Sequence, residues 1–225
     1  MIAADRPVQR PADAKLLVVD RQHHLQQFPR QMLVDILRPG DLVIANDAAT
    51  LPASLHGTHV PTESPIEVRL AGRRSLAVDD VSDFFAIVFG TGDFQTRTEH
   101  RLPPPPLAAG HRLALGPLSA TITRIVTPPR LVELHVDGTP DAIWAGIARH
   151  GRPIQYAHLP AALMLWDVWT PIAGQPAAFE PPSAGFVLDW HAVATMRERG
   201  VGFARWHDRR DLSLAHRGNL ADRQG

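Results

Sequence analysis

The segment Ile66-Glu67-Val68-Arg69-Leu70 decides the fold, because apolar and charged side chains alternate along it as they do in a β-strand. Runs of strand type, separated by glycine, proline or aspartate, also cover residues 84–89, 113–115, 121–126 and 131–136. Short, evenly spaced strands without intervening helices indicate a small closed barrel or a sandwich. Between two of these runs, Pro103 to Pro106 form a stiff polyproline stretch, which is either an edge connection or an SH3-type ligand.

The residues before this region have the pattern of an α/β layer. Residues 16–19 and 41–45 are apolar runs with β-branched members, which predicts two buried strands. Between them, apolar residues recur at helical spacing over residues 32–37, and Pro39-Gly40 stops that helix. The order strand, helix, strand indicates part of an α/β layer.

The residues after this region return to helical patterns. Thr139-Pro140-Asp141 supplies a capping hydroxyl, a proline at the first position and an acid in the first turn. Residues 166–170 are a short aromatic strand or a loop. Asp189 can cap a further helix that Gly200 closes, and residues 201–204 are the next strand.

These patterns predict an α/β (α+β) domain that is interrupted by a small antiparallel β-barrel. Residues 1–50 form the first part of the α/β domain, residues 51–137 the inserted barrel and residues 138–204 the second part. Residues 205–225 have almost no apolar periodicity, which predicts a disordered tail. The alternative for this tail is an RNA-binding arm, although its acids offset much of its positive charge.

Composition narrows the classes of function. The 225 residues contain 23 Lys and Arg against 23 Asp and Glu, so any nucleic-acid contact must come from a local patch. The lack of cysteine excludes disulfides, thiolate metal sites and thiol nucleophiles. The histidines follow no ligand spacing, so we predict no metal site. No signal peptide and no apolar run of about eighteen residues occurs, so we expect a cytoplasmic protein without a membrane segment.

Candidate binding groups gather in three short stretches. In His150-Gly151-Arg152-Pro153-Ile154-Gln155-Tyr156, Gly151 has the place of a helix C-cap with positive φ, and the flanking side chains present donors and a ring from a rigid turn. Ser183-Ala184-Gly185 precedes a helix whose free amides can hold an anion. The alternative for both stretches is two ordinary loops. Asn46-Asp47 ends a strand, where it either accepts ribose hydroxyls or forms an Asx turn.

As an ordered set, several short segments resemble the S-adenosylmethionine:tRNA ribosyltransferase-isomerase family of queuosine biosynthesis. The segments are collinear and reach from residue 16 to residue 204. They comprise 37–43, Asn46-Asp47, 51–53, Leu55 with Gly57, 66–68, 150–156, 182–185 and 199–201.

The resemblance implies an α/β domain interrupted by a β-barrel, and it implies a reaction. The ribosyl moiety of S-adenosylmethionine would be transferred to a 7-aminomethyl-7-deazaguanine base in tRNA and rearranged to an epoxycyclopentane. S-adenosylmethionine is then a substrate, tRNA is the partner, and no metal or prosthetic group is required. The residues expected to line the substrate pocket are Asn46, Asp47, His150, Arg152, Tyr156, Thr170, Ser183 and Gly185.

The sequence also departs from the family pattern. Ala48-Ala49 follow Asn46-Asp47 where the family has Thr-Arg, and Ser54 stands where an arginine is expected, so an anion-binding guanidinium is missing. The likeness stops after Trp206-His207-Asp208, which predicts a C-terminally truncated member with an unpaired sheet edge, through which copies can self-associate. The alternative function is a non-catalytic nucleoside- or RNA-binding module derived from the family.

Overall fold

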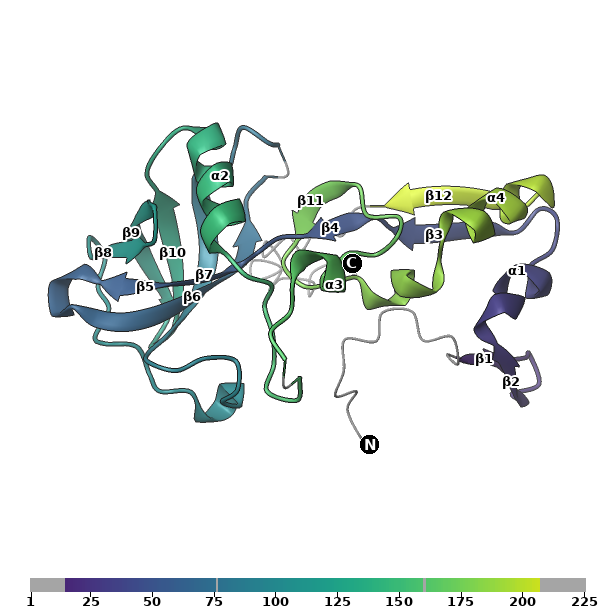
Figure 1. Ribbon diagram of the computed structural model, residues 1–225, viewed down its shortest axis with the longest axis horizontal. Coiled ribbons are helices and arrows are strands. Elements are labelled where there is room, and N and C mark those ends of the chain that lie inside the picture. Colours follow the sequence, from purple (N-terminus) through teal and green to yellow (C-terminus); the bar gives the residue numbers. More distant parts are fainter. Residues whose placement is uncertain (1–14, 76, 160, 207–225) are drawn as a thin grey trace, which may run out of the picture. The chain divides into compact units, whose positions relative to one another are not determined.

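The computed structural model describes residues 15–75, 77–159 and 161–206 (Figure 1). Contacts divide these residues into two compact units. Of the described residues, those between 51 and 162 form the barrel unit, and residues 15–50 together with 163–206 form the α/β unit. Each unit is described by itself. The segment 138–162, which the sequence assigned to the α/β domain, clusters with the barrel.

A closed barrel of six antiparallel strands dominates its unit, with the order β10-β7-β6-β5-β8-β9 (Figure 1). The predicted barrel is therefore confirmed and the sandwich alternative is wrong. The strands are β5 (Ser54–His59), β6 (Ser64–Arg73), β7 (Asp83–Phe89), β8 (Arg112–Leu115), β9 (Leu118–Thr127) and β10 (Leu131–Val136). The short 3-10 helices η2 (Val60–Thr62) and η3 (Thr98–His100) lie in the connections.

Alternate apolar residues of several strands fill the barrel. Val68, Ala86 and Ile122 are each 0% exposed and lie on strands β6, β7 and β9. Strand β5 has no apolar alternation, which is why the sequence did not predict it. Gly57 is required there because a Cβ at this position would lie 2.0 Å from the backbone oxygen of Ala114.

Helix α2 (Pro140–His150) packs on the barrel through Ile143, Gly146 and Ile147. The Thr139 hydroxyl accepts a hydrogen bond from the Ala142 amide (3.3 Å), as expected for an N-cap. Ile143 and Ile147 are buried, and a Cβ on Gly146 would lie 2.3 Å from Leu118. Glycine therefore lets the helix approach strand β9 closely.

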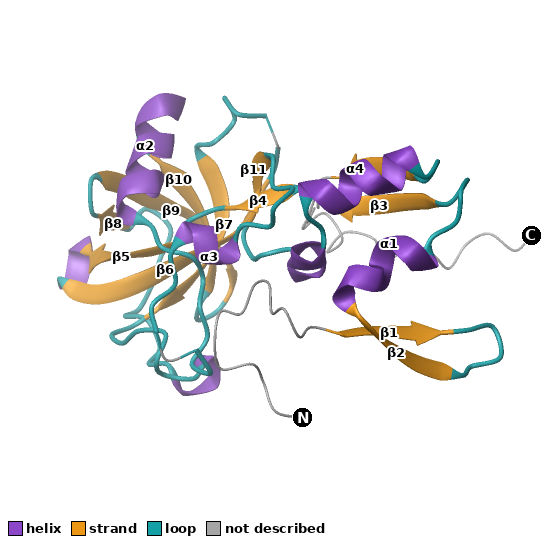
Figure 2. Ribbon diagram, turned by 45° about the vertical axis from the view of Figure 1, so that its right-hand side comes forward, coloured by secondary structure: helices purple, strands orange, loops and turns teal. Residues whose placement is uncertain are grey.

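The α/β unit contains three two-stranded sheets. Strand β3 (Leu42–Asn46) pairs in parallel with β12 (Gly202–Trp206), and β4 (Ala48–Thr50) pairs in parallel with β11 (Gln175–Ala178). Strands β1 (Lys15–Val19) and β2 (Leu25–Pro29) form an antiparallel hairpin (Figure 2). The helices are η1 (Arg30–Met32), α1 (Leu33–Ile36), α3 (Leu165–Val168), η4 (Ser183–Val187) and α4 (Trp190–Glu198).

The apolar core of this unit lies mainly where α1 and α4 meet the sheet of β3 and β12. Val193 and Met196 of α4 are 1% and 0% exposed, and they cluster with Val34, Ala45 and Val201. Asp189 caps α4 as predicted, because its carboxylate accepts from the Ala192 amide (2.7 Å). The mixed α/β fold with an inserted barrel thus confirms the predicted fold class.

Several local predictions for this unit are wrong. The strands at residues 16–19 and 41–45 exist but are not buried on both faces, since Leu17 is 62% exposed and Ile44 66%, whereas Ala45 belongs to the core. Strand β1 pairs with β2 and does not join β3, because Asp20 accepts from the amides two and four residues on and so folds the chain back as a hairpin. Residues 165–168 form helix α3 in place of a strand or a loop.

Two further expectations concern the chain end and the surface. Residues 205 and 206 belong to β12, and the rest of the predicted tail lies outside the described residues. Self-association through a sheet edge stays a prediction. No described helix is long and apolar enough to cross a membrane.

Candidate functional site

Asn46 is the last residue of strand β3 and Asp47 follows it, and the structure gives the two residues different roles. The Asn46 side chain accepts a hydrogen bond from the Ala48 amide (2.9 Å), so this residue forms the Asx turn that the sequence left as an alternative. Asp47 is only 2% exposed, and its backbone oxygen accepts from the Gly174 amide (2.7 Å). Its Oδ2 atom lies 3.6 Å from Nε of Arg205. Asp47 is thus a buried carboxylate beside the Arg205 guanidinium.

Thr170 and Gly185 lie against each other in the same unit. A Cβ on Gly185 would lie 3.0 Å from Cγ2 of Thr170, so glycine permits this close approach. Thr170 begins the turn that leads to Gly174 and thereby to Asp47, since its backbone oxygen accepts from the Ala173 amide (3.0 Å). Its hydroxyl is buried and has no hydrogen-bond partner among the described residues. The turn thus connects three of the predicted residues.

The predicted anion-binding helix start at residues 183–185 is wrong. Ser183 begins the 3-10 helix η4, and it does not open α4, whose cap is Asp189. The Ser183 amide donates to the Pro181 oxygen and the Gly185 amide to the Pro182 oxygen, each at 2.8 Å. The two amides are already used within the loop.

In the barrel unit, His150 and Gly151 serve packing. Nε2 of His150 donates to the backbone oxygen of His56 (2.7 Å), and the imidazole lies against Gly116 in the β8–β9 turn. Gly151 has φ of −72°, so the predicted left-handed cap is wrong. Glycine is needed for another reason, because a Cβ there would lie 2.0 Å from the backbone oxygen of Pro52.

Arg152 and Tyr156 present side chains at the surface of the barrel unit. The backbone of Arg152 forms an antiparallel bridge with Ser54 (2.8 and 2.9 Å), which leaves its exposed guanidinium free to point outward. Tyr156 is 39% exposed and lines a groove of about 310 Å³ together with residues 97–99, Ala157 and His158. These two residues keep the surface position that a binding role requires.

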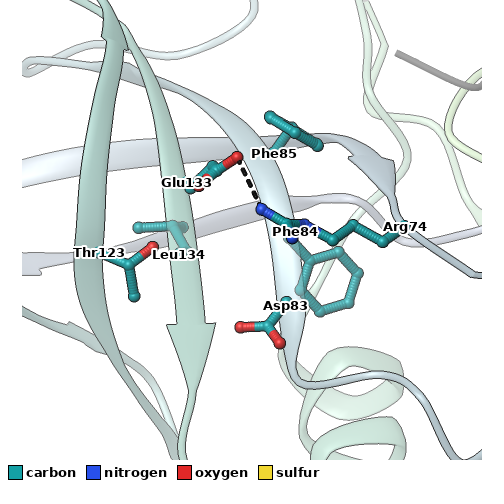
Figure 3. Close-up of a pocket in the computed structure, with 7 residues that line it drawn as sticks. All are labelled: Arg74, Asp83, Phe84, Phe85, Thr123, Glu133 and Leu134. Carbon is teal, nitrogen blue, oxygen red and sulfur yellow. Dashed lines mark hydrogen bonds and ion pairs between the residues drawn. The ribbon is translucent and has the colours of Figure 1, made fainter. Parts of the chain in front are cut away.

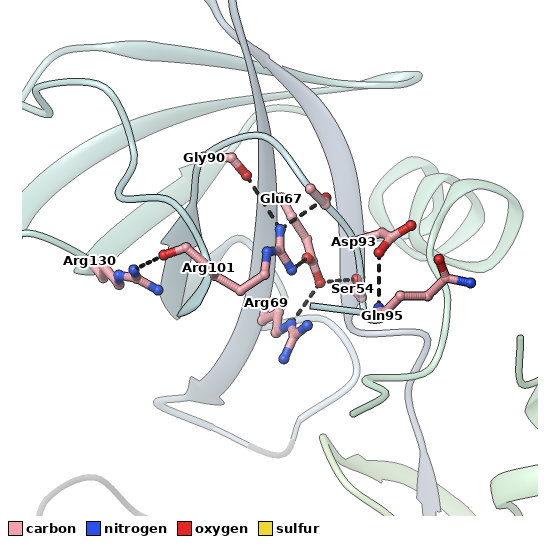
Figure 4. Close-up of polar contacts among 9 residues, drawn as sticks. Ser54, Glu67, Arg69, Gly90, Asp93, Gln95, Arg101 and Arg130 are labelled. Carbon is pink, nitrogen blue, oxygen red and sulfur yellow. Dashed lines mark hydrogen bonds and ion pairs between the residues drawn. The ribbon is translucent and has the colours of Figure 1, made fainter. Parts of the chain in front are cut away.

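The structure adds a buried charge cluster centred on Glu67, which is 2% exposed (Figure 4). Oε1 of Glu67 accepts from the Ser54 hydroxyl (2.8 Å) and from Nε of Arg69 (2.6 Å). Oε2 accepts from Nη1 of Arg101, whose Nη2 also donates to the oxygen of Gly92 (3.0 Å). Every carboxylate oxygen therefore has a partner, as a buried charge requires.

Competing effects set the ionisation of Glu67. Burial raises the pKa of its carboxyl, but the hydrogen bond and charge of Arg69, together with the hydrogen bonds from Arg101 and Ser54, outweigh it and leave the pKa below its ordinary value. The carboxylate is thus held in its charged form. The sequence placed Glu67 in a predicted strand but did not identify its partners.

One signal could have identified Arg69. Glu67 and Arg69 are two residues apart on strand β6, so they lie on the same side of it, opposite the apolar residues that fill the barrel. The partner Arg101 could not have been found in this way, because it comes from the loop after β7. It is long-range packing that places this third charge.

A second groove, of about 260 Å³, lies on the barrel beside Phe84 and Phe85 (Figure 3). Glu133 accepts there from Arg74 (3.2 Å) and, outside the drawn set, from Arg124 (2.6 Å). Both arginines are more than half exposed, so these ion pairs contribute little to stability. The groove gathers none of the predicted residues. Within the described residues, no group of three His, Asp or Glu could hold a metal ion.

Comparison with known proteins identifies the family. The sequence model of the family described as "Queuosine biosynthesis protein" matches residues 1–207. The chain belongs to this family. The resemblance seen in the sequence is thereby confirmed at the level of the family.

Individual relatives of the family are distant from this chain. It is 26% identical to the S-adenosylmethionine:tRNA ribosyltransferase-isomerase of Gloeobacter violaceus over 88% of the chain and 51% of that protein. The enzyme of the same name from Thermosynechococcus vestitus has the same identity and coverage. The chain therefore spans about half the length of these curated relatives. A crystal structure of S-adenosylmethionine tRNA ribosyltransferase from Thermotoga maritima matches with a TM-score of 0.32 and 16% identity, over 91% of this chain and 53% of that one.

Proposed function

We propose that this chain binds S-adenosylmethionine and takes part in transferring its ribosyl moiety to a 7-deazaguanine base in tRNA, with isomerisation of that moiety. The observation that carries the proposal is the family match over residues 1–207, together with the names of the curated relatives. S-adenosylmethionine is a substrate in this scheme, tRNA is the partner, and the cytoplasm is the compartment.

The α/β unit offers the groups for a ribose or a nucleoside. Asp47 is a buried acid at the end of a parallel strand, where carboxylates accept ribose hydroxyls in many α/β proteins. The buried Thr170 hydroxyl, on the turn that leads to Asp47, can donate or accept one further hydrogen bond. Asn46, Ser183 and Gly185 support the same loops. We infer that Asp47 and Thr170 contact the ligand directly.

The barrel unit offers groups for an anionic partner. Arg152 is exposed and its backbone is fixed by the bridge to Ser54, so the guanidinium starts from a rigid point. Tyr156 adds a half-exposed ring, and His150 fixes the preceding helix end. These residues favour a contact with RNA over a contact with S-adenosylmethionine, whose sulfonium is positively charged.

Calorimetric titration with S-adenosylmethionine tests the first step. We expect saturable binding by the purified chain and a loss of about 1–3 kcal/mol in Asp47→Asn, because a charge-assisted hydrogen bond is removed while the size of the side chain is kept. Arg152→Ala should bind S-adenosylmethionine normally and precursor tRNA more weakly, whereas Arg149→Ala, a neighbouring exposed arginine, should change neither. No binding by a folded wild-type chain would contradict the proposal.

A non-catalytic nucleoside- or RNA-binding module is the second candidate. The observation that favours it is Ser54, which stands where the family resemblance leads us to expect an arginine. The Ser54 hydroxyl is instead spent on Glu67 and cannot reach a ligand as a guanidinium does. A radiolabel in the ribosyl group of S-adenosylmethionine separates the two candidates: transfer of the label to precursor tRNA supports the enzyme, and binding without transfer supports the module.

A further inference from the structure

Three guanidinium groups surround the ring of Phe89 in the barrel unit. The guanidinium carbons of Arg69, Arg101 and Arg130 lie 5.0, 5.0 and 4.7 Å from the ring centroid. Only one acid, Glu67, forms a salt bridge with this set among the described residues. Burial and the charge of Arg101 lower the pKa of Arg130, which reflects the crowding of like charges. The cluster therefore carries an excess of positive charge in a largely desolvated place, and an anion would relieve it.

Arg69 is the member of this cluster that can receive such an anion. Its Nε donates to Glu67, but its two terminal amino groups make no hydrogen bond to any described residue. The Arg69 side chain is only 6% exposed, but these amino groups are not among the fully buried unpartnered atoms, so they keep a small contact with solvent. A guanidinium that presents two parallel N–H groups from a fixed position is suited to a phosphate.

The rings next to Arg69 form a surface for stacking. The Arg69 guanidinium lies between Phe89, at 5.0 Å, and Tyr156, at 5.9 Å. Beyond Tyr156, the ring of His158 lies almost parallel to it, with 9° between the planes and 6.4 Å between the centroids. Both rings line the groove of about 310 Å³, and both are exposed. A nucleobase is flat and can stack on such a pair.

We propose that the groove at Tyr156 and His158, with Arg69 at its edge, binds one unpaired nucleotide of an RNA strand. The base stacks on the two rings, and its phosphate meets the free amino groups of Arg69. Arg97 and Glu99 also line the groove, but they pair with each other at 3.8 Å, so the net positive charge comes from the cluster beneath. The inference rests on the proposed function for the choice of RNA as ligand, and it assigns the residues that hold one nucleotide of that RNA.

Fluorescence anisotropy with a single-stranded RNA of about seven nucleotides tests this assignment. His158→Ala should weaken binding about 5- to 30-fold, because stacking on an exposed ring is lost. Arg69→Gln should weaken it as well and should reduce the salt dependence, since one phosphate contact contributes about 0.7 to the logarithmic slope for single strands. His135→Ala, which removes another exposed imidazole, on strand β10 and outside the groove lining, should bind as the wild type does.

The outcomes separate this inference from the proposed function. Arg69→Gln can unfold the barrel, because Arg69 is buried and paired with Glu67. The deciding variant is therefore His158→Ala, which removes an exposed ring that stacks on Tyr156. Unchanged RNA affinity in His158→Ala overturns the inference. If inorganic phosphate displaces the RNA and His158→Ala has no effect, the groove is an anion site without base stacking. This result also overturns the inference. If the wild type binds the RNA but does not bind S-adenosylmethionine, the proposed function is contradicted and the nucleotide site is not.

Discussion

Replacing Glu67 by glutamine should destabilise the barrel unit far more than a single exposed acid would. The carboxylate accepts from Ser54, Arg69 and Arg101, and the two arginines are 5% and 3% exposed. A glutamine of the same size keeps one acceptor oxygen but turns an amino group toward a guanidinium. The buried positive charges are then left without their partner, and breaking a buried ion pair on one side costs about 3–5 kcal/mol. This is a large part of a total stability of about 5–15 kcal/mol.

Glu133→Gln is the matched control, because Glu133 also accepts from two arginines on the same barrel. Arg74 and Arg124 are 68% and 59% exposed at their side chains, so water replaces the lost partner and the cost should be about 0–1 kcal/mol. The free energy of unfolding is measured by urea denaturation, followed by circular dichroism and by hydrogen exchange of the β6 segment. Equal losses in the two variants would refute the argument that burial makes the Glu67 cluster costly to break.

Three further predictions concern the packing and charges of both units. Gly151→Ala should prevent stable folding of the segment after α2 or lower the free energy of unfolding by more than about 3 kcal/mol, because its Cβ would lie 2.0 Å from the Pro52 oxygen. Gly110→Ala, in open space at φ +86°, should lower it by only about 1 kcal/mol, and thermal unfolding compares the two variants. Thr170→Val should leave stability unchanged or raise it by up to about 1 kcal/mol, since a buried hydroxyl without a described partner is removed, while weakening S-adenosylmethionine binding in the same calorimetric titration. Because folding lowers the pKa of Glu67, its ionised form stabilises the barrel at pH values above the ordinary carboxyl pKa. This contribution is lost as the pH falls through the folded-state pKa, so the stability of Glu67→Gln, measured over the same acid range, should lack this part of the pH dependence.

The strands of the barrel could be predicted because their inner residues are apolar at every second position. Strand β5 could not be, because its inward positions include Gly57 and His59. His59 is 0% exposed and is accommodated by hydrogen-bonding contacts to Thr62 (2.7 Å) and His111 (2.9 Å), the latter 52 residues away. No pattern within β5 itself contains that information.

In the α/β unit, the sequence located the strands but not their surroundings. Continuous apolar runs such as 41–45 usually lie in sheets covered on both faces. Here Val43 and Ala45 turn toward α4 and its neighbours, whereas Leu42 and Ile44 are 61% and 66% exposed. Whether a strand is buried depends on which elements cover each of its faces, and the residues of the strand itself do not contain this information.

The candidate site could be predicted only where a motif fixes its own geometry. The turn at Asn46 and the cap at Asp189 are local and followed from residue type, whereas Gly151 was identified for the wrong reason. A glycine in a helix-ending position suggests positive φ, but the constraint here is a backbone oxygen of Pro52, almost a hundred residues earlier in the chain. A close contact with a distant backbone therefore requires glycine just as a left-handed turn does, and the sequence alone does not distinguish the two causes.

Position 54 shows how the structure changes the meaning of a departure from the family pattern. Serine at this position suggested that a guanidinium is missing from the barrel. The structure places the Ser54 hydroxyl and Nε of Arg69 on the same oxygen of Glu67, at 2.8 and 2.6 Å. Arg69, from β6, therefore places a guanidinium on the carboxylate that the Ser54 hydroxyl also contacts. Arg69 uses only Nε for this contact, and its two terminal amino groups make no hydrogen bond to any described residue, so the departure at position 54 does not leave this part of the barrel without a guanidinium.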